Sequence, residues 1–534
     1  MGNRAVGTAV LILALAGCAP PDAPVAPPTV HTPDPNTPLV VNTLPLPERF
    51  DPVGSDDPYT QRIAGLLQRG LFRYDAKGRA LPEVAERVTT EDGRRYRVQL
   101  APGWRFSDGE PVTAHSFVDA WNRAADPASP QVRRELFSPI EGFVPSDAIR
   151  AGHDSQPLTG LHVVDDLEFT ITLRAPHPGF EQRLGHVAFA PLPRLAFEDP
   201  DAYAQRPIGN GPYRVEGEWR ADGVTLRPSA AYTAGDAAQN PGLDFRAYPT
   251  PQAALADVTA GTLDVLDTLP TDALTDFRTT FGERAISQPV GQVFDLAVPE
   301  AGQFTGAAGT QRREALSRAV DREALATGVY AGTRAPATDY AAPVVEGHSQ
   351  GLCGDTCRLD AGAARDLLED AGGWSGEMSI AYALDTDDRR AARQICSDVM
   401  TNLGVTCTTR EHPTTLALLE AVASGEETSP FLHSYRMDYP LLESFLLPRF
   451  RSGAMQNVVG YRDPVSDAAL ARASATEPTA GRTNRFLAAE RLVLEDLPVI
   501  PLLTVNAAVV SSEAASNVRV DVFGAPVYGQ IRRP

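Results

Sequence analysis

Apolar and polar residues alternate along several short stretches of the chain. The stretch RVTTEDGRRYRVQL, residues 87–100, carries the turn dipeptide Asp92-Gly93 before one such run. Because successive side chains of a strand point to opposite faces, this pattern predicts a β-hairpin. The stretch LEFTITLRAP, residues 167–176, repeats the alternation and predicts a further strand. The alternating apolar positions are Tyr96, Val98 and Leu100 in the hairpin and Phe169, Ile171 and Leu173 in the later strand.

The region from about residue 360 to 411 mixes this alternation with helical periodicity. We expect a helix that Asp360 caps and Gly372 stops, followed by a strand in MSIAYAL, residues 378–384. The stretch DRRAARQICSDVMTNLG, residues 388–404, places apolar residues on one helical face, and VTCTTRE, residues 405–411, follows it as a strand. The order helix–strand–helix–strand predicts an α/β lobe.

The N-terminal sequence has the form of an export signal. Arg4 precedes an apolar run over residues 5–16, which is shorter than the roughly 20 residues that span a membrane. The run ends in Leu-Ala-Gly-Cys, which resembles a bacterial lipobox. The resemblance implies that residues 1–17 are removed and that Cys18 becomes a diacylated N-terminus. The alternative is a cysteine that stands there by chance.

Residues 18–38 are rich in proline and poor in bulky apolar side chains. Such a segment stays extended and cannot bury a core, so it predicts a tether between a lipid anchor and a body that begins near Leu39. We therefore expect an extracytoplasmic protein that is held by lipid to the outer face of the bacterial cell membrane.

The remaining cysteines agree with an exported protein. Cys396 lies on the apolar face of its predicted helix, and Cys407 lies on the inner face of the strand that follows. We therefore pair Cys396 with Cys407 and, by elimination, Cys353 with Cys357. In the alternative, His348, Cys353 and Cys357 bind a metal, but a clear fourth ligand is missing, so we expect neither a metal nor a cofactor.

Charge and composition exclude several classes of function. The chain has 48 Lys+Arg against 68 Asp+Glu, a formal net charge of −20, and no basic stretch, so nucleic acid is not an expected partner. Lys77 is its one lysine, so the sequence contains no Gly-Lys-Ser/Thr phosphate loop. The hydrophobic fraction of 43% is that of a folded globular protein.

Five segments in series resemble the family 5 extracellular solute-binding proteins, the peptide and nickel receptors of ABC importers. They cover the body of the chain from about residue 39 to residue 534, in the order of the family. The first contains the core WRFSDGEPVTA, and the second is PIGNGPYRV. The five segments are residues 70–127, residues 207–215, ALSRAVDREAL at 315–325, DAGAARDLLEDAG at 360–372 and ERLVLEDLPVIPLLT at 490–504.

The resemblance implies an α/β fold of the periplasmic-binding-protein type, class II or cluster C. Two α/β lobes would be joined by a hinge, and an extra domain would be inserted in the first lobe. We expect a monomer that binds a peptide ligand and an ABC permease and makes or breaks no covalent bond. The implied boundaries are 39–75, 204–288 and 499–534 for lobe I, 76–203 for the inserted domain II and 289–498 for lobe II.

The stretch HSYRMDYPLLESFLLPRF resembles the ligand loop of this family. The resemblance implies that Asp438 grips the N-terminal ammonium of a peptide, that Tyr435 and Tyr439 flank it, and that the backbone of residues 435–437 pairs with the peptide. Arg436 and Met437 depart from the family pattern. Arg436 either pairs with Asp438 and quenches the site or binds a ligand carboxylate. Alternatively, Asp438 only caps the turn before the next proline.

A second candidate wall of the site is the stretch DPVGSDDPYTQ. Its place ahead of Gly-Leu-Phe resembles the family segment whose backbone meets the ligand from lobe I. The candidate residues are Asp56, Asp57, Pro58 and Tyr59. The alternative is a solvated acidic turn.

Three rival functions remain at the level of sequence. The pentapeptide GHSQG, residues 347–351, matches the nucleophile elbow of serine hydrolases, but the helix that the elbow requires after Ser349 is missing. The second rival is a receptor for a metal chelate, haem or a sugar. The third is a scaffold or sensor lipoprotein that has lost transport.

Overall fold

The computed structural model describes residues 35–55, 57–127, 133–145, 156–477 and 480–533. The predicted lipidation site Cys18, the leader before it, most of the tether and Asp56 lie outside these residues. Within the described ranges, no helix is long and apolar enough to cross a bilayer.

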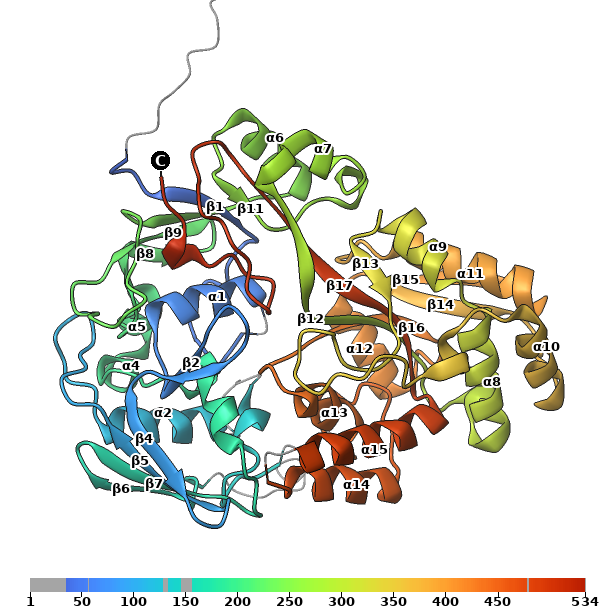
Figure 1. Ribbon diagram of the computed structural model, residues 1–534, viewed down its shortest axis with the longest axis horizontal. Coiled ribbons are helices and arrows are strands. Elements are labelled where there is room, and N and C mark those ends of the chain that lie inside the picture. The colour runs from blue at the N-terminus through green and yellow to red at the C-terminus, as the bar shows by residue number, and fades with distance from the viewer. Residues whose placement is uncertain (1–34, 56, 128–132, 146–155, 478–479, 534) are drawn as a thin grey trace, which may run out of the picture.

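The described residues form an 11-stranded sheet with the strand order β15-β14-β16-β12-β17-β11-β1-β10-β9-β8 and with β13 paired to β17. Two 13-residue strands, β12 (Ala285–Ala297) and β17 (Val499–Ser511), run antiparallel through its middle and join the two halves (Figure 1). The other strands are β1 (Leu39–Thr43), β8 (Tyr213–Arg220), β9 (Gly223–Pro228), β10 (Leu243–Ala247), β11 (Val265–Leu266), β13 (Arg334–Pro336), β14 (Met378–Ala383), β15 (Cys407–His412) and β16 (Phe431–Arg436).

Each half of the sheet carries its own helices. We call the half with β1 and β8–β11 lobe I; its helices are α1 (Pro58–Leu67), α6 (Pro251–Ala260) and α7 (Phe277–Phe281). We call the half with β13–β16 lobe II, and both faces of its strands are buried. Its longer helices are α8 (Gly306–Ala319), α10 (Ala361–Asp370), α11 (Arg389–Leu403), α12 (Thr415–Ser424), α13 (Leu442–Phe450), α14 (Pro464–Ser474) and α15 (Ala480–Asp496).

A small-sheet region, which we define as Phe72–Gln205, adjoins lobe I. It holds a two-stranded sheet and a four-stranded antiparallel sheet of order β4-β5-β7-β6. Its buried Trp121 and Phe169 belong to the same hydrophobic core as Phe245 of lobe I, so the two parts pack as one body. Its elements are β2 (Phe72–Tyr74), β3 (Ala80–Pro82), β4 (Ala85–Thr90), β5 (Arg95–Leu100), α2 (Ala114–Ala125), β6 (Leu161–Asp165), β7 (Glu168–Thr172), α4 (Leu195–Glu198) and α5 (Pro200–Gln205).

The local elements expected from the sequence are present. The predicted hairpin is β4–β5, and the later alternating stretch is β7. The Asp360 side chain accepts a hydrogen bond from the Ala363 backbone N–H at 2.9 Å and thereby caps α10. Gly404 ends α11 in the left-handed conformation at φ 69°, which a residue with a side chain rarely adopts. The region 360–411 is therefore the predicted helix–strand–helix–strand unit.

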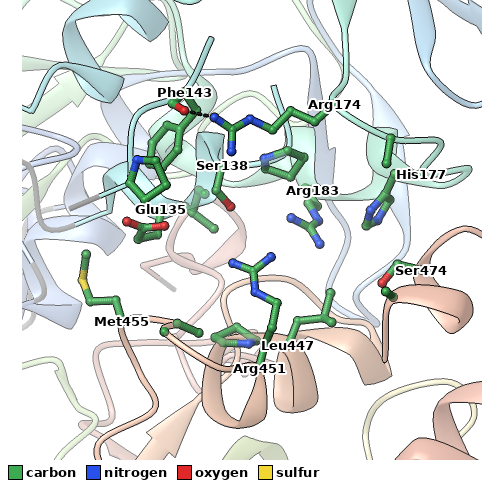
Figure 2. Close-up of a pocket in the computed structure, with 18 of the residues that line it drawn as sticks. Glu135, Ser138, Phe143, Arg174, His177, Arg183, Leu447, Arg451, Met455 and Ser474 are labelled. Atoms are coloured by element: carbon green, nitrogen blue, oxygen red, sulfur yellow. Dashed lines mark hydrogen bonds between the residues drawn. The ribbon is translucent and has the colours of Figure 1, made fainter. Parts of the chain in front are cut away.

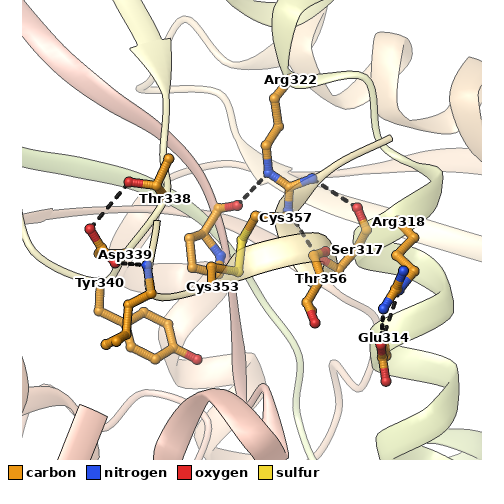
Figure 3. Close-up of a disulfide and its surroundings, with 12 residues drawn as sticks. Glu314, Ser317, Arg318, Arg322, Thr338, Asp339, Tyr340, Cys353, Thr356 and Cys357 are labelled. Carbon is orange, nitrogen blue, oxygen red and sulfur yellow. Dashed lines mark hydrogen bonds and ion pairs between the residues drawn. A yellow bond between two sulfur atoms is a disulfide. The ribbon is translucent and has the colours of Figure 1, made fainter. Parts of the chain in front are cut away.

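Both predicted disulfides are present. Cys396 on α11 is bonded to Cys407 on β15 with a Cα–Cα distance of 5.1 Å, and Cys353 is bonded to Cys357 with one of 5.6 Å. Figure 3 shows the second disulfide beside α8, where the Ser317 hydroxyl donates to the Thr356 carbonyl. Because Cys353 and Cys357 are joined in a disulfide, neither thiol is available to a metal. The described residues contain no cluster of His, Cys, Asp or Glu suited to a metal ion.

Candidate ligand-binding site

The loop that follows β16 is held by backbone bonds on both sides. Arg436 lies opposite Gln292 of β12, and the Met437 N–H donates to the Gly291 carbonyl at 2.9 Å. At the start of α13, the Ser444 hydroxyl accepts from the Asp438 N–H at 3.0 Å. Residues 437–441 are therefore held between the central strand β12 and the first turn of α13.

Asp438 is paired with a cation from another part of the chain. The Arg133 guanidinium, in the small-sheet region, donates to Asp438 Oδ1, and the Asp438 side chain is 9% exposed. The described residues give Oδ2 of this carboxylate neither a hydrogen bond nor an ion pair. Sequence reasoning considered Arg436 as the internal partner and missed Arg133, which lies 305 residues away along the chain.

The two tyrosines beside Asp438 are packed into the interior. The Tyr435 hydroxyl donates to the Ser444 carbonyl at 2.6 Å, and its ring meets the Phe445 ring edge-on. The Arg183 guanidinium lies over the Tyr439 ring at 4.9 Å. Burial raises the pKa of both phenols, so both stay neutral. The two rings fix the loop that carries the aspartate.

Met437, which departs from the family pattern, has a local explanation. Its side chain is 3% exposed and lies against Gly291, where an added Cβ would overlap the Met437 sulfur. A glycine on β12 therefore makes room for the methionine on the adjoining loop. The side chain of Met437 is part of the core, and its N–H is already bonded.

Arg436 points away from Asp438, toward lobe I. Its guanidinium donates to Gln292 Oε1 at 3.2 Å. Burial lowers the pKa of Arg436 to about 10, and repulsion by Arg62 acts in the same direction, whereas the nearby Tyr59 acts against it. Arg436 therefore interacts electrostatically with groups of lobe I, among them Tyr59, which was also singled out in the sequence.

The second candidate wall has several structural roles. The Tyr59 hydroxyl donates to Asp267 Oδ1 at 2.7 Å, and the same carboxylate is paired with Arg62. Asp57 is the N-cap of α1, where it accepts from the Thr60 N–H at 2.6 Å, and Pro58 is the first residue of the helix.

A cavity of about 490 Å³ lies beside Asp438, between the small-sheet region and lobe II. Arg133, Glu135, Arg174 and Arg183 line its small-sheet side, and Arg451, just after α13, lines its lobe II side. Figure 2 shows Arg174 and Arg451 reaching into this space from opposite walls.

A buried charge cluster lies behind one wall of the cavity. The Glu443 carboxylate on α13 lies 3.2 Å from His177 Nε2 and 3.1 Å from Arg183 Nε, and Arg482 of α15 also donates to it. Burial by itself would raise the pKa of Glu443, but attraction to His177, Arg183 and Arg482 holds it well below its usual range. The cluster therefore joins the small-sheet region to lobe II through an ionised carboxylate.

The pentapeptide GHSQG does not form a nucleophile elbow. The residues before Ser349, which could have passed as a short strand, contain a turn and one isolated bridge, Glu346 to Leu441. After Ser349 come bends and the 3-10 turn Gly354–Cys357. An elbow requires a helix N-terminus directly behind the serine, so these residues build no oxyanion hole.

The family model of the bacterial extracellular solute-binding proteins, family 5, matches residues 79–457, which is more than half of the chain. This chain belongs to that family. Family 5 consists of binding proteins for transport, so the chain is not an enzyme, and GHSQG is a loop of a binding protein.

Relatives with similar sequences cover most of the chain. The periplasmic oligopeptide-binding protein OppA of Haemophilus influenzae is 24% identical over 489 residues, which is 87% of each protein. The periplasmic murein peptide-binding protein MppA of Escherichia coli is 24% identical over 468 residues, 83% of each protein.

Solved structures agree with the fold. The Escherichia coli murein tripeptide binding protein MppA matches with a TM-score of 0.78 at 20% identity, over 93% of this chain and 98% of that chain. Haemophilus influenzae OppA in complex with the peptide RPPGFSPFR matches with a TM-score of 0.77 at 21% identity, over the same two fractions. The periplasmic-binding-protein fold that was expected from the sequence is therefore confirmed.

Proposed function

We propose that this chain is the substrate-binding lipoprotein of an ABC importer, which captures oligopeptides between its lobes and delivers them to a membrane permease. The names of the relatives support the peptide as ligand. The observation that carries the proposal is Asp438, a nearly buried carboxylate on a loop fixed between β12 and α13 at the edge of a cavity.

In this proposal the peptide ammonium pairs with Asp438 Oδ2. Arg133 occupies Oδ1, so the two cations share one carboxylate or the ligand displaces the guanidinium. A charge-assisted contact in a partly dry site is stronger than the same contact in water. In this proposal Arg133 and the ligand ammonium compete for the Asp438 carboxylate, and Arg133 pairs with it in the free protein.

The main chain of residues 435–437 supplies the remaining contacts in the proposal. Since the Met437 N–H is bonded to Gly291, the alternation of an antiparallel ladder directs the N–H and C=O of Arg436 to the other edge of β16. On that edge the described pairing with β14 is a single register pair, Ala381 with Phe431. A peptide backbone would add there as a short strand.

Transport in this proposal follows from closure of the two lobes. Binding energy that is gained from both lobes favours the closed state, and a permease recognises that state. The long strands β12 and β17 connect the lobes, so the proposed hinge lies there. The division into 39–75, 204–288 and 499–534, then 76–203, then 289–498 is part of the same proposal.

The ammonium contact is tested by calorimetry with trialanine and N-acetyl-trialanine. We expect Asp438→Asn to weaken the binding of the free peptide about 10- to 100-fold, the equivalent of about 1.5–3 kcal/mol for a charged hydrogen bond. The acetylated peptide should bind both proteins alike. Asp222→Asn, which removes an exposed carboxylate in lobe I, is the matched control. Unchanged affinity for trialanine in Asp438→Asn would exclude the ammonium role.

The Arg133–Asp438 pair favours a second candidate, a receptor for a small ligand that has no ammonium group. In that case the guanidinium is the permanent partner of the carboxylate. Mass spectrometry of the small molecules that copurify with the chain separates the two candidates. Peptides support the first, and a compound without an amine supports the second.

The lipid anchor is tested by membrane fractionation. We expect the full-length chain in the membrane fraction and the Cys18→Ser chain in the soluble fraction, because a single acylated cysteine carries the anchor. A Cys18→Ser chain that stays in the membrane fraction would contradict the proposal.

A further inference from the structure

The cavity beside Asp438 is rich in positive charge. Among the described residues that line it, the arginines are Arg133, Arg174, Arg183 and Arg451, the one histidine is His177, and the acidic residues are Glu135 and Asp438. The arginines thus outnumber the carboxylates in a protein whose formal net charge is −20. The composition of the chain would predict more acidic than basic residues around a cavity. The excess of positive charge is therefore a property of this cavity.

Two of these arginines have no acidic partner among the residues that the structure describes. Arg133 is paired with Asp438, and Arg183 with Glu443. The Arg174 guanidinium donates to the Phe143 carbonyl, and within the described part of the chain no ion pair reaches it. The described residues give the Arg451 guanidinium neither a hydrogen bond nor an ion pair. Both side chains face the cavity from opposite walls (Figure 2).

Like charges that face each other across a cavity repel, although solvent screens part of this repulsion because Arg174 and Arg451 are both exposed. An anion between the two guanidinium groups removes the repulsion and gains charge-assisted hydrogen bonds, for which guanidinium and carboxylate geometries match. Phe143, Leu447 and Met455 add apolar wall, which suits the methylene stem of a carboxylate-bearing side chain.

We propose that this cavity is a subsite for a carboxylate of the ligand, held by Arg174 and Arg451. Resting on the proposed function, this makes the preferred ligand a peptide with a carboxylate near its ammonium end, because Asp438 lines the same cavity. The carboxylate comes either from a Glu or Asp side chain or from the C-terminus of a very short peptide. Arg174 and Arg451 then determine specificity.

Calorimetry with three peptides on the mature full chain tests the subsite. The peptides are alanyl-glutamyl-alanine, alanyl-glutaminyl-alanine and the C-terminal amide of the first. We expect at least about tenfold weaker binding when the carboxylate that occupies the cavity is neutralised, since a charged hydrogen bond contributes at least that factor. Loss on the change from Glu to Gln assigns the side chain, and loss on amidation assigns the C-terminus.

Variants then assign the preference to the cavity. Arg451→Met should reduce the preference to less than about threefold with no change in melting temperature, because Arg451 is exposed. Arg174→Met provides the second test from the opposite wall. Arg393→Met is the control: it removes an exposed arginine of α11, which does not line the cavity, and should keep the full preference.

Three results would overturn the subsite, and they do so in two distinguishable ways. The cavity does not bind a ligand carboxylate if the wild type binds all three peptides with equal affinity, or if Arg451→Met keeps the same preference as Arg393→Met. The proposed binding of peptides is then unaffected. If the wild type binds none of the peptides, the proposed function fails, and the subsite fails with it.

Discussion

Replacing Glu443 by glutamine is expected to disrupt the buried contact between the small-sheet region and lobe II. The Glu443 side chain is 1% exposed, and its carboxylate meets His177, Arg183 and Arg482. Burial lowers the pKa of His177, attraction to Glu443 raises it and repulsion by the two arginines lowers it, so that this pKa lies below its usual value. The ionised Glu443 therefore neutralises part of the charge of two buried guanidinium groups.

The size of the effect follows from these partners. Glutamine keeps the volume of Glu443, so no cavity forms, but it leaves Arg183 and Arg482 without this carboxylate at side-chain exposures of 7% and 9%. Breaking a buried ion pair by removing one partner costs about 3–5 kcal/mol. Because the amide oxygen of glutamine still accepts one hydrogen bond, we expect a loss near the lower end, about 3 kcal/mol in the free energy of unfolding.

Urea unfolding followed by tryptophan fluorescence measures this loss, and Glu426→Gln, on an exposed loop, is the control. Since the pKa of Glu443 is depressed in the folded state, its contribution is fully present above the ordinary value of 4.5 and is lost as the pH falls toward the folded pKa. The difference between wild type and Glu443→Gln should therefore be constant from pH 6 to 8 and shrink below pH 4.5. A difference no larger than that of the control at pH 7, or one that does not depend on pH, would refute this reasoning.

Three further predictions concern other features of the fold. Gly291→Ala should destabilise the protein by about 1–3 kcal/mol through overlap with Met437; a loss in urea unfolding that does not shrink when Met437→Ala is added would contradict this. Replacing Cys396 and Cys407 by serine opens a loop with a sequence separation of 11 and should cost roughly 2–3 kcal/mol, seen as a lower melting temperature than that of the wild type. Ser349→Ala should change neither ligand affinity nor stability by more than about 0.5 kcal/mol, and a larger change in calorimetry would reopen the role of the pentapeptide.

Local features of this protein were predictable from local sequence. The hairpin β4–β5 follows from alternation around Asp92-Gly93, and α10 follows from the cap Asp360. The pairing of Cys396 with Cys407 was accessible because the helix and the strand that carry them are consecutive. In each case the residues that decide the structure lie within about a dozen positions of one another, where backbone geometry alone relates them.

The surroundings of the candidate site were predictable only in part. The loop around Asp438 was singled out by its resemblance to a family motif, and in the structure Asp438 lines a cavity. The partner of Asp438 was not foreseen, because any of many arginines could pair with it and no local pattern distinguishes Arg133. The close packing of Met437 on Gly291 likewise could not be predicted from the local sequence around either residue.

The sequence by itself determined the secondary structure of the α/β segments, the disulfide pairing and the family, because these depend on periodicity, short spacings and motifs in series. Only the tertiary structure decided which charges meet. His177 and Arg183 from one segment and Arg482 from another meet at Glu443, and Arg174 faces Arg451 across a cavity. The local sequence around a charged side chain does not indicate which residue will be its partner. The path of the chain through the fold brings the two together.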